Sequence, residues 1–197
     1  MTKFKGLAKY LLVQFLALFI FVPGLAAANL ESEVEPRNLR INEINYNPPG
    51  DDSKYEWIEI INTGIEPIEI ITGSGGNALR IIDNKGKHIF VPIESTFGDG
   101  ILEAGEFAVL IRNFEGFNEI YPDYEGELFK VSINLNNTAD SLGLAVGSSG
   151  ESWDLVNYQN SWGADGNGKT LEKINPNLEN QELNWQESAN NGGSSGI

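Results

Sequence analysis

The chain has 197 residues and carries 13 Lys plus Arg against 28 Asp plus Glu, so its formal net charge is −15 at pH 7. Because nucleic-acid-binding proteins neutralise phosphates with clustered Lys and Arg, this charge argues against a nucleic-acid partner. The chain has no cysteine and one histidine, His88, which excludes disulfides, cysteine nucleophiles and metal sites built from thiolates or several histidines. The composition therefore predicts no cofactor.

Residues 1–28 have the three-part layout of a secretory signal peptide. Three lysines precede an apolar run over 11–22, and Ala26 and Ala28 supply the small residues that signal peptidase requires. The alternative is an uncleaved anchor, but the run is shorter than the roughly 20 residues that span a bilayer. Cleavage after Ala28 would remove the three lysines and change the net charge from −15 to −18. We therefore expect a secreted, periplasmic or cell-surface protein without a membrane span after cleavage.

The mature chain is predicted to form one domain over residues 39–188. A chain of about 150 residues buries enough surface to fold without disulfides. Residues 29–38 are mostly acidic or polar and are interpreted as a leader. Residues 189–197, with the sequence ANNGGSSGI, are interpreted as a flexible tail.

Within that domain, short segments rich in β-branched and aromatic residues alternate with Gly, Asn, Asp and Pro. This pattern predicts an all-β antiparallel sandwich of about eight to ten strands. One helix is expected over 114–121, where apolar residues recur at helical spacing before Pro122. A hairpin turn is expected over 83–86 and a surface loop over 72–77. The expected strands are 39–46, 55–62, 66–71, 78–82, 88–91, 106–112, 127–131, 141–146, 153–158 and 169–174.

An ordered series of motifs over about residues 39–190 resembles the lamin-tail domain family, in its exported prokaryotic branch. The motifs are INEINYNP (41–48), EWIEIIN (56–62), IEI (68–70), LEAGEFAVL (102–110), LNNTADSLGL (135–144), DLVNY (154–158), WGADGNGKTLE (162–172) and WQES (185–188). The resemblance implies an immunoglobulin-like β-sandwich and carries over no catalytic residues. The chain departs from the family pattern at 72–77, where TGSGGN stands in the region in which members usually have a Trp.

Three glutamates fall inside apolar strand patterns, at Glu43, Glu56 and Glu59. Two carboxylates that face each other could form a glycosidase pair or a metal site. The alternative, which we adopt, is that these side chains lie at strand edges or pair with Lys54 or Arg40. Nothing in the sequence fixes their spacing, and no acid–base partner accompanies them.

Oxygen ligands of the kind that Ca²⁺ prefers occur at Asp51, Asp52 and in the run DGNG at 165–168. The EF-hand template requires an oxygen ligand at its fifth position and Glu at its twelfth, and those positions hold Lys169 and Pro176. The run is therefore interpreted as a glycine-rich turn, and no metal-binding residue is assigned.

The four tryptophans are interpreted mainly as core residues, and the alternative is a platform on which carbohydrate stacks. Trp162 is the expected exposed member, because its neighbours are glycine and polar residues. The others are Trp57, Trp153 and Trp185. The sequence thus leaves a carbohydrate-binding surface open as an alternative.

The sequence predicts a non-catalytic interaction or adhesion module with a protein or cell-surface partner that it does not identify. No catalytic or cofactor-binding residue is assigned, since His88 lacks a nucleophile motif and is interpreted as a solvated strand residue. Two alternatives stay open. One is a carbohydrate- or calcium-binding accessory module, and the other is a targeting fragment of a larger exported hydrolase or nuclease. The oligomeric state is not specified.

Overall fold

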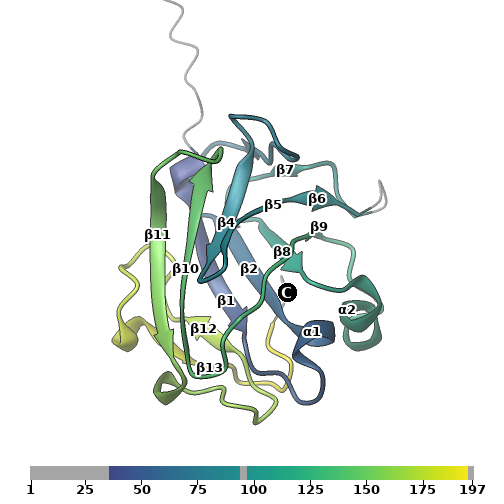
Figure 1. Cartoon of the computed structure of the whole chain (residues 1–197), viewed down its shortest axis with the longest axis vertical. Coiled ribbons are helices and arrows are strands. Elements are labelled where there is room, and N and C mark those ends of the chain that lie inside the picture. Colours follow the sequence, from purple (N-terminus) through teal and green to yellow (C-terminus); the bar gives the residue numbers. More distant parts are fainter. Residues whose placement is uncertain (1–35, 94–96, 195–197) are drawn as a thin grey trace, which may run out of the picture. The chain divides into compact units, whose positions relative to one another are not determined.

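The computed structural model describes residues 36–93 and 97–194, which all fall within one compact unit, Ser32–Ile197 (Figure 1). The predicted signal peptide and all but the end of the predicted leader lie outside the described residues. Within the described ranges, 13 strands form sheets of seven, four and two strands, and no helix is long and apolar enough to cross a membrane.

The largest sheet has the strand order β13-β12-β1-β2-β8-β9-β6. Its neighbouring strands pair antiparallel except β8 and β9, which are parallel. The exception to the predicted antiparallel arrangement arises because helix α2 carries the chain back across the sheet between these two strands. The bounds are β1 (Leu39–Asn45), β2 (Trp57–Asn62), β6 (Val91–Pro92), β8 (Phe107–Ile111), β9 (Glu127–Lys130), β12 (Leu171–Lys173), β13 (Trp185–Glu187) and α2 (Phe114–Ile120).

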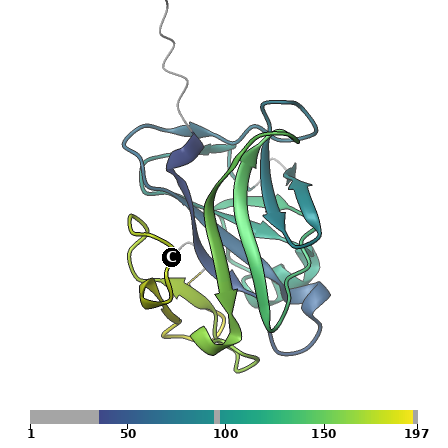
Figure 2. The same ribbon diagram turned by 60° about the vertical axis from the view of Figure 1, so that its left-hand side comes forward.

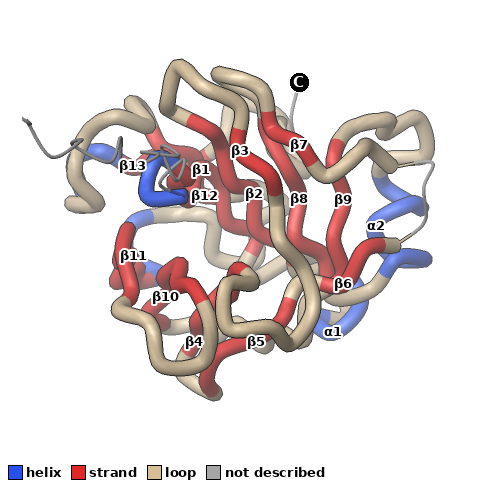
Figure 3. The backbone as a smooth tube through the Cα atoms, turned by 90° about the horizontal axis from the view of Figure 1, so that it is seen from above, coloured by secondary structure: helices blue, strands red, loops and turns tan. Residues whose placement is uncertain are grey.

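The second sheet has the order β11-β10-β4-β5 and faces the first (Figures 1 and 3). Its two longest strands, β10 and β11, run side by side in green in Figure 2. A pair of short strands, β3 and β7, makes the third sheet. The bounds are β3 (Ile68–Glu69), β4 (Leu79–Asp83), β5 (Gly86–Ile89), β7 (Ile101–Leu102), β10 (Ala139–Val146) and β11 (Ser152–Gln159).

The main core lies between the two larger sheets and combines buried side chains from both. All six residues of β2 are buried, as expected for a central strand with two apolar faces. Ile58 and Ile60 belong to the main core, whereas Trp57 packs with Val109 and with Phe117 of α2 in a second core. The structure therefore confirms the predicted all-β sandwich, with a helix covering part of its outer face.

Several element boundaries differ from the sequence prediction. The short helix α1 (Asp52–Tyr55) replaces the start of the expected strand over 55–62, and the Asp51 side chain caps it by accepting a hydrogen bond from Ser53 N at 2.9 Å. The expected strand over 88–91 is divided between β5 and β6, which belong to different sheets. Strands β7 and β13 were not predicted because they have only two and three residues. Short 3₁₀ helices are η1 (Pro36–Asn38), η2 (Asn160–Trp162) and η3 (Glu182–Asn184).

Residues 189–194, in the segment interpreted as a flexible tail, pack against the seven-stranded sheet. Gly192 N donates to Gly168 O at 2.7 Å, and the Tyr121 hydroxyl donates to Gly192 O. Ser194 Oγ donates to Glu43 Oε2 at 2.7 Å. These contacts link the segment to three distant parts of the chain, which its Gly, Ser and Asn composition does not indicate.

Candidate functional site

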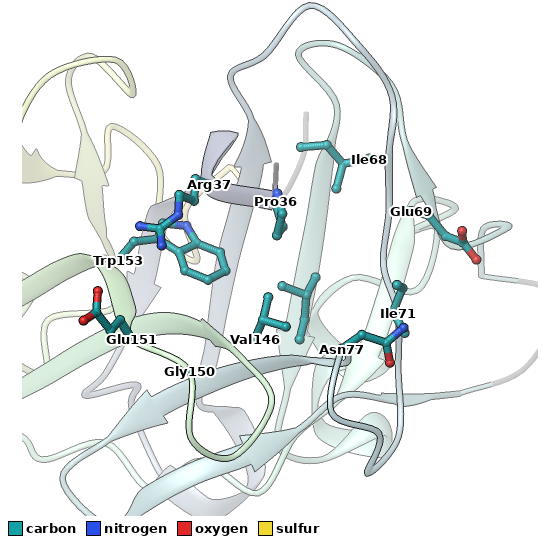
Figure 4. Close-up of a pocket in the computed structure, with 11 residues that line it drawn as sticks. Pro36, Arg37, Ile68, Glu69, Ile71, Asn77, Val146, Gly150, Glu151 and Trp153 are labelled. Atoms are coloured by element: carbon teal, nitrogen blue, oxygen red, sulfur yellow. The ribbon is translucent and has the colours of Figure 1, made fainter. Parts of the chain in front are cut away.

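A groove of about 460 Å³ opens at one end of the sandwich, where η1, β3 and the start of β11 meet (Figure 4). Its apolar lining includes Ile68, Leu79, Val146 and Trp153. Trp153 is 8% exposed and is fixed by a hydrogen bond from its Nε1 to Leu39 O at 3.1 Å. The groove is therefore lined by core side chains whose positions the sandwich fixes.

Charged and polar side chains surround this apolar lining. Arg37 and Glu151 lie on the same side as Trp153 in Figure 4, whereas Glu69 and Asn77 lie on the opposite side. All four of these polar residues are exposed. An apolar depression with a polar, solvent-accessible rim is the usual composition of a protein-binding surface.

The loop over 72–77, which contributes Asn77 to the lining of the groove, is held by Arg80. This arginine is buried, and its Nη1 donates to Gly73 O and Leu79 O at 2.8 Å each. Its Nη2 donates to Gly75 O at 3.1 Å. The sequence pattern indicates the loop but not the role of Arg80, because a strand arginine beside a glycine-rich loop has no sequence signature of this contact.

We expect the substitution Arg80→Met to lower the free energy of unfolding by about 2–3 kcal/mol, because it removes three charge-assisted hydrogen bonds to backbone carbonyls, one of them buried. The loop over 72–77 should also become sensitive to a broad-specificity protease. Chemical denaturation and limited proteolysis measure the two effects, with Lys130→Met at an exposed position as the control. An Arg80→Met protein with unchanged stability and an uncut loop would show that Arg80 does not hold this loop.

The structure brings together two of the three glutamates that the sequence singled out. Glu43 on β1 is the register partner of Glu59 on β2 and of Glu172 on β12. Glu43 and Glu59 are at most 1% exposed, and Glu59 Oε1 accepts a hydrogen bond from Asn42 Nδ2 at 2.8 Å. Burial leaves no room for a substrate to reach these carboxylates, which favours a structural role.

Glu43 is enclosed by hydroxyl donors. Its carboxylate accepts hydrogen bonds from Thr170 Oγ1 at 2.5 Å and from Ser194 Oγ at 2.7 Å. Burial raises the pKa of Glu43 above its ordinary value, and the hydrogen bonds from Thr170 and Ser194 offset this effect only in part. The interpretation of Glu43 as a strand-edge residue is therefore wrong: it lies on a central strand, beneath the chain's C-terminal segment.

The predicted partners of these glutamates are also wrong. Lys54 Nζ pairs with Glu119 at 2.8 Å, and Arg40 lies near Asp154 instead. Glu56 pairs with Arg112 at 2.8 Å, across the space between α1 and the end of β8. Sequence patterns could not identify these partners, because each pair joins segments far apart in the chain.

The residues considered as calcium ligands make hydrogen bonds of their own. The Asp165 carboxylate accepts from Asn47 Nδ2 at 2.7 Å and from Asn160 Nδ2 at 3.1 Å. The Asp52 carboxylate accepts from Asn137 Nδ2 at 3.0 Å. In the part of the chain that the structure describes, no group of three or more His, Asp or Glu side chains is arranged to hold a metal ion.

His88 is not the solvated residue that the sequence analysis expected. Its side chain is 15% exposed, and its Nε2 lies 2.8 Å from Asp83 Oδ1. Burial raises the pKa of Asp83, but hydrogen bonds from His88, Asn134 N and Lys85 N outweigh it, so that the pKa lies below its ordinary value. Since Asp83 also ends β4 at the predicted hairpin turn, the His88–Asp83 pair stabilises this hairpin.

Three of the four tryptophans are buried, as predicted: Trp57, Trp153 and Trp185. Trp162 is the most exposed of the four, and it packs partly against the main core. Trp153 therefore lines the groove, whereas the partly exposed Trp162 does not.

The fold and the groove together define a β-sandwich with a preformed depression suited to binding. No family model, no curated protein and no solved structure matches the chain.

Proposed function

We propose that this chain is an exported, non-catalytic interaction module of the lamin-tail type, which binds an extended segment of a partner protein in the groove. The observation that carries this proposal is the groove itself, with an apolar lining and a charged rim. The motif series over 39–190 supports the assignment to the lamin-tail type, with its immunoglobulin-like sandwich. The signal-peptide pattern of residues 1–28 supports export.

Two features of the groove favour an extended segment as its occupant. One is that β11, which begins at the groove, is an edge strand of its sheet, and an edge strand has backbone groups that a partner strand can pair with. The other is that the groove is lined by separate apolar side chains, among them Ile68, Val146 and Trp153. Alternate side chains of an extended peptide can insert between such residues.

The charge of the chain favours a partner segment that carries Lys or Arg. The net charge is −15, and Glu69 and Glu151 lie on the rim of the groove. Charge complementarity of this kind speeds association and selects against acidic partners. We therefore expect apolar residues at alternate positions, flanked by basic residues.

The proposal of a non-catalytic role depends on the positions of the titratable groups. Glu43 and Glu59 are buried, and His88 is engaged by Asp83. Glu56 is also buried and is paired with Arg112. None of these groups is among the residues that line the groove.

Peptides with alternating apolar residues and basic flanks should bind the purified protein and lose about tenfold or more in affinity with Ile71→Asp, which places a charge in the groove. Leu183→Asp is the matched control, because Leu183 is 91% exposed and does not line the groove. Isothermal titration of both variants and the wild type measures this difference.

Equal affinity of the wild type and Ile71→Asp would contradict binding at the groove. Glycans offered in parallel test the carbohydrate alternative. Glycan binding that Trp162→Ala abolishes, without any peptide binding, would replace our proposal by the accessory-module alternative.

A further inference from the structure

A lysine, an aspartate and an asparagine converge between β11 and the loop that joins β12 to β13. The Lys173 side chain is fully buried, and its Nζ lies 3.6 Å from Asp154 Oδ1, beyond normal hydrogen-bond distance. Asn180 Nδ2 donates to the same Oδ1 at 2.9 Å. Within the described residues, Lys173 Nζ and Asn180 Oδ1 are buried and make no hydrogen bond.

Unsatisfied buried polar atoms are rare in native proteins, and each calls for an explanation. Here the Lys173 amine and the Asn180 carboxamide both lie against Asp154, whose Oδ1 is 3.6 Å from the amine nitrogen and 2.9 Å from the carboxamide nitrogen. We propose that Lys173 and Asn180 form an intramolecular amide bond between Nζ and Cγ, promoted by the Asp154 carboxylate. This covalent cross-link is independent of the function proposed for the groove.

The reaction needs no oxidant, reductant or further reactant. The neutral amine of Lys173 attacks Asn180 Cγ, and the electron pair of the C=O bond moves to the oxygen to form a tetrahedral intermediate. Asp154 takes a proton from the attacking nitrogen and delivers it to the leaving nitrogen, since its Oδ1 lies near both. The C–N bond to the carboxamide nitrogen then breaks as the C=O bond re-forms, and the products are one secondary amide and one ammonia.

The surroundings of Lys173 favour the neutral amine that this attack requires. Burial lowers the pKa of Lys173, and the attraction of Asp154, which raises it, offsets burial only in part. The Nζ lies 5.9 Å from the centre of the Trp185 ring, which covers it with an apolar surface. A neutral amine in such a place is a better nucleophile than an exposed lysine.

Asp154 is held in position by its backbone and its neighbours. It has a φ of 51°, in the left-handed region that non-glycine residues seldom adopt. Its Oδ2 accepts a hydrogen bond from Ile41 N, and its Oδ1 lies 3.7 Å from Arg40 Nη1. A fixed carboxylate between two nitrogens is the geometry that proton transfer between them requires.

An opening next to this cluster gives ammonia a way out. A cavity of about 320 Å³ is lined by Asp154 and Asn180, among other residues. The bond would close a ring from Lys173 to Asn180 and fix the loop between β12 and β13. A chain without cysteine has no disulfide with which to fix a loop in this way.

Intact-mass spectrometry of the folded wild-type protein tests this proposal without any substitution. We expect a mass lower, by one ammonia, than that calculated from its sequence. A protease that cleaves after glutamate separates 173–179 from 180–182, because Glu172, Glu179 and Glu182 bound these peptides. The two peptides should remain joined, which distinguishes the cross-link from a succinimide formed at an asparagine.

Variants identify the atoms involved. Lys173→Arg, Asn180→Ala and Asp154→Asn should each have their full calculated mass and yield separate peptides, whereas the controls Lys169→Arg and Asn177→Ala should keep the cross-link. A wild-type protein that keeps its full mass after prolonged incubation in the folded state would overturn the proposal. A mass loss that survives Lys173→Arg or Asn180→Ala would also overturn it.

Discussion

Replacing Trp57 by alanine is expected to lower the free energy of unfolding by about 3–5 kcal/mol, because it removes a large buried aromatic and leaves a cavity. Trp57 is 1% exposed and meets the rings of Phe117 and Tyr121 edge-on, at centroid distances of 6.5 and 6.1 Å. The loss should detach α2 from the outer face of the sheet. Chemical denaturation followed by circular dichroism measures the change.

Trp162→Ala is the matched control for this prediction, because Trp162 is only partly buried and lies outside the second core. We expect it to cost less than half as much. A Trp57→Ala protein as stable as the wild type would contradict the placement of Trp57 beneath α2.

The stability of the protein is expected to fall as the pH rises from about 4.5 to about 7, chiefly because of Glu56. Burial raises the pKa of Glu56 from 4.5 to about 7, despite the opposing effect of Arg112. Between these values the folded state keeps a proton that the unfolded state has released, so deprotonation favours unfolding. The difference between the folded-state and unfolded-state pKa of Glu56 corresponds to about 3 kcal/mol of stability. This stability is present below pH 4.5 and is lost as the pH rises past 7. Burial raises the pKa of Glu43, Glu127, Asp140 and Glu172 in the same direction.

Thermal and chemical unfolding at a series of pH values tests this prediction. Glu56→Gln should flatten the fall in stability between pH 4.5 and 7. Glu119→Gln should leave it unchanged, because Glu119 is exposed and its pKa is lowered by Lys54. Stability that rises from pH 5 to 8, or a Glu56→Gln curve parallel to the wild type, would contradict this account.

Local sequence patterns predicted the elements whose hydrophobic period is unambiguous. The sequence WIEIIN is apolar on both faces and became the fully buried strand β2. The helix over 114–121 was predicted from its spacing and its stop at Pro122, and α2 has nearly these bounds. In both cases the signal lies within a few consecutive residues, so no tertiary information was needed.

The groove and the Lys173 cluster were not predicted, because distant segments build them. The groove joins Pro36, Ile68, Val146 and Trp153, which no local pattern relates. Lys173 looks like a solvated lysine near the end of a strand, and only the register of β12 with β13 places it beside Trp185. Asp154 lies at an irregularity in the pairing of β10 with β11, which sequence does not indicate.

The most direct test of the proposed binding site uses the four tryptophans as reporters. Protein labelled with ¹⁵N at tryptophan gives one indole signal for each of Trp57, Trp153, Trp162 and Trp185, and only Trp153 lines the groove. Titration with a peptide of alternating apolar residues and basic flanks should shift the Trp153 signal saturably and leave the other three in place. A saturable shift of Trp162 with Trp153 unmoved would contradict binding at the groove, and so would the absence of any saturable shift.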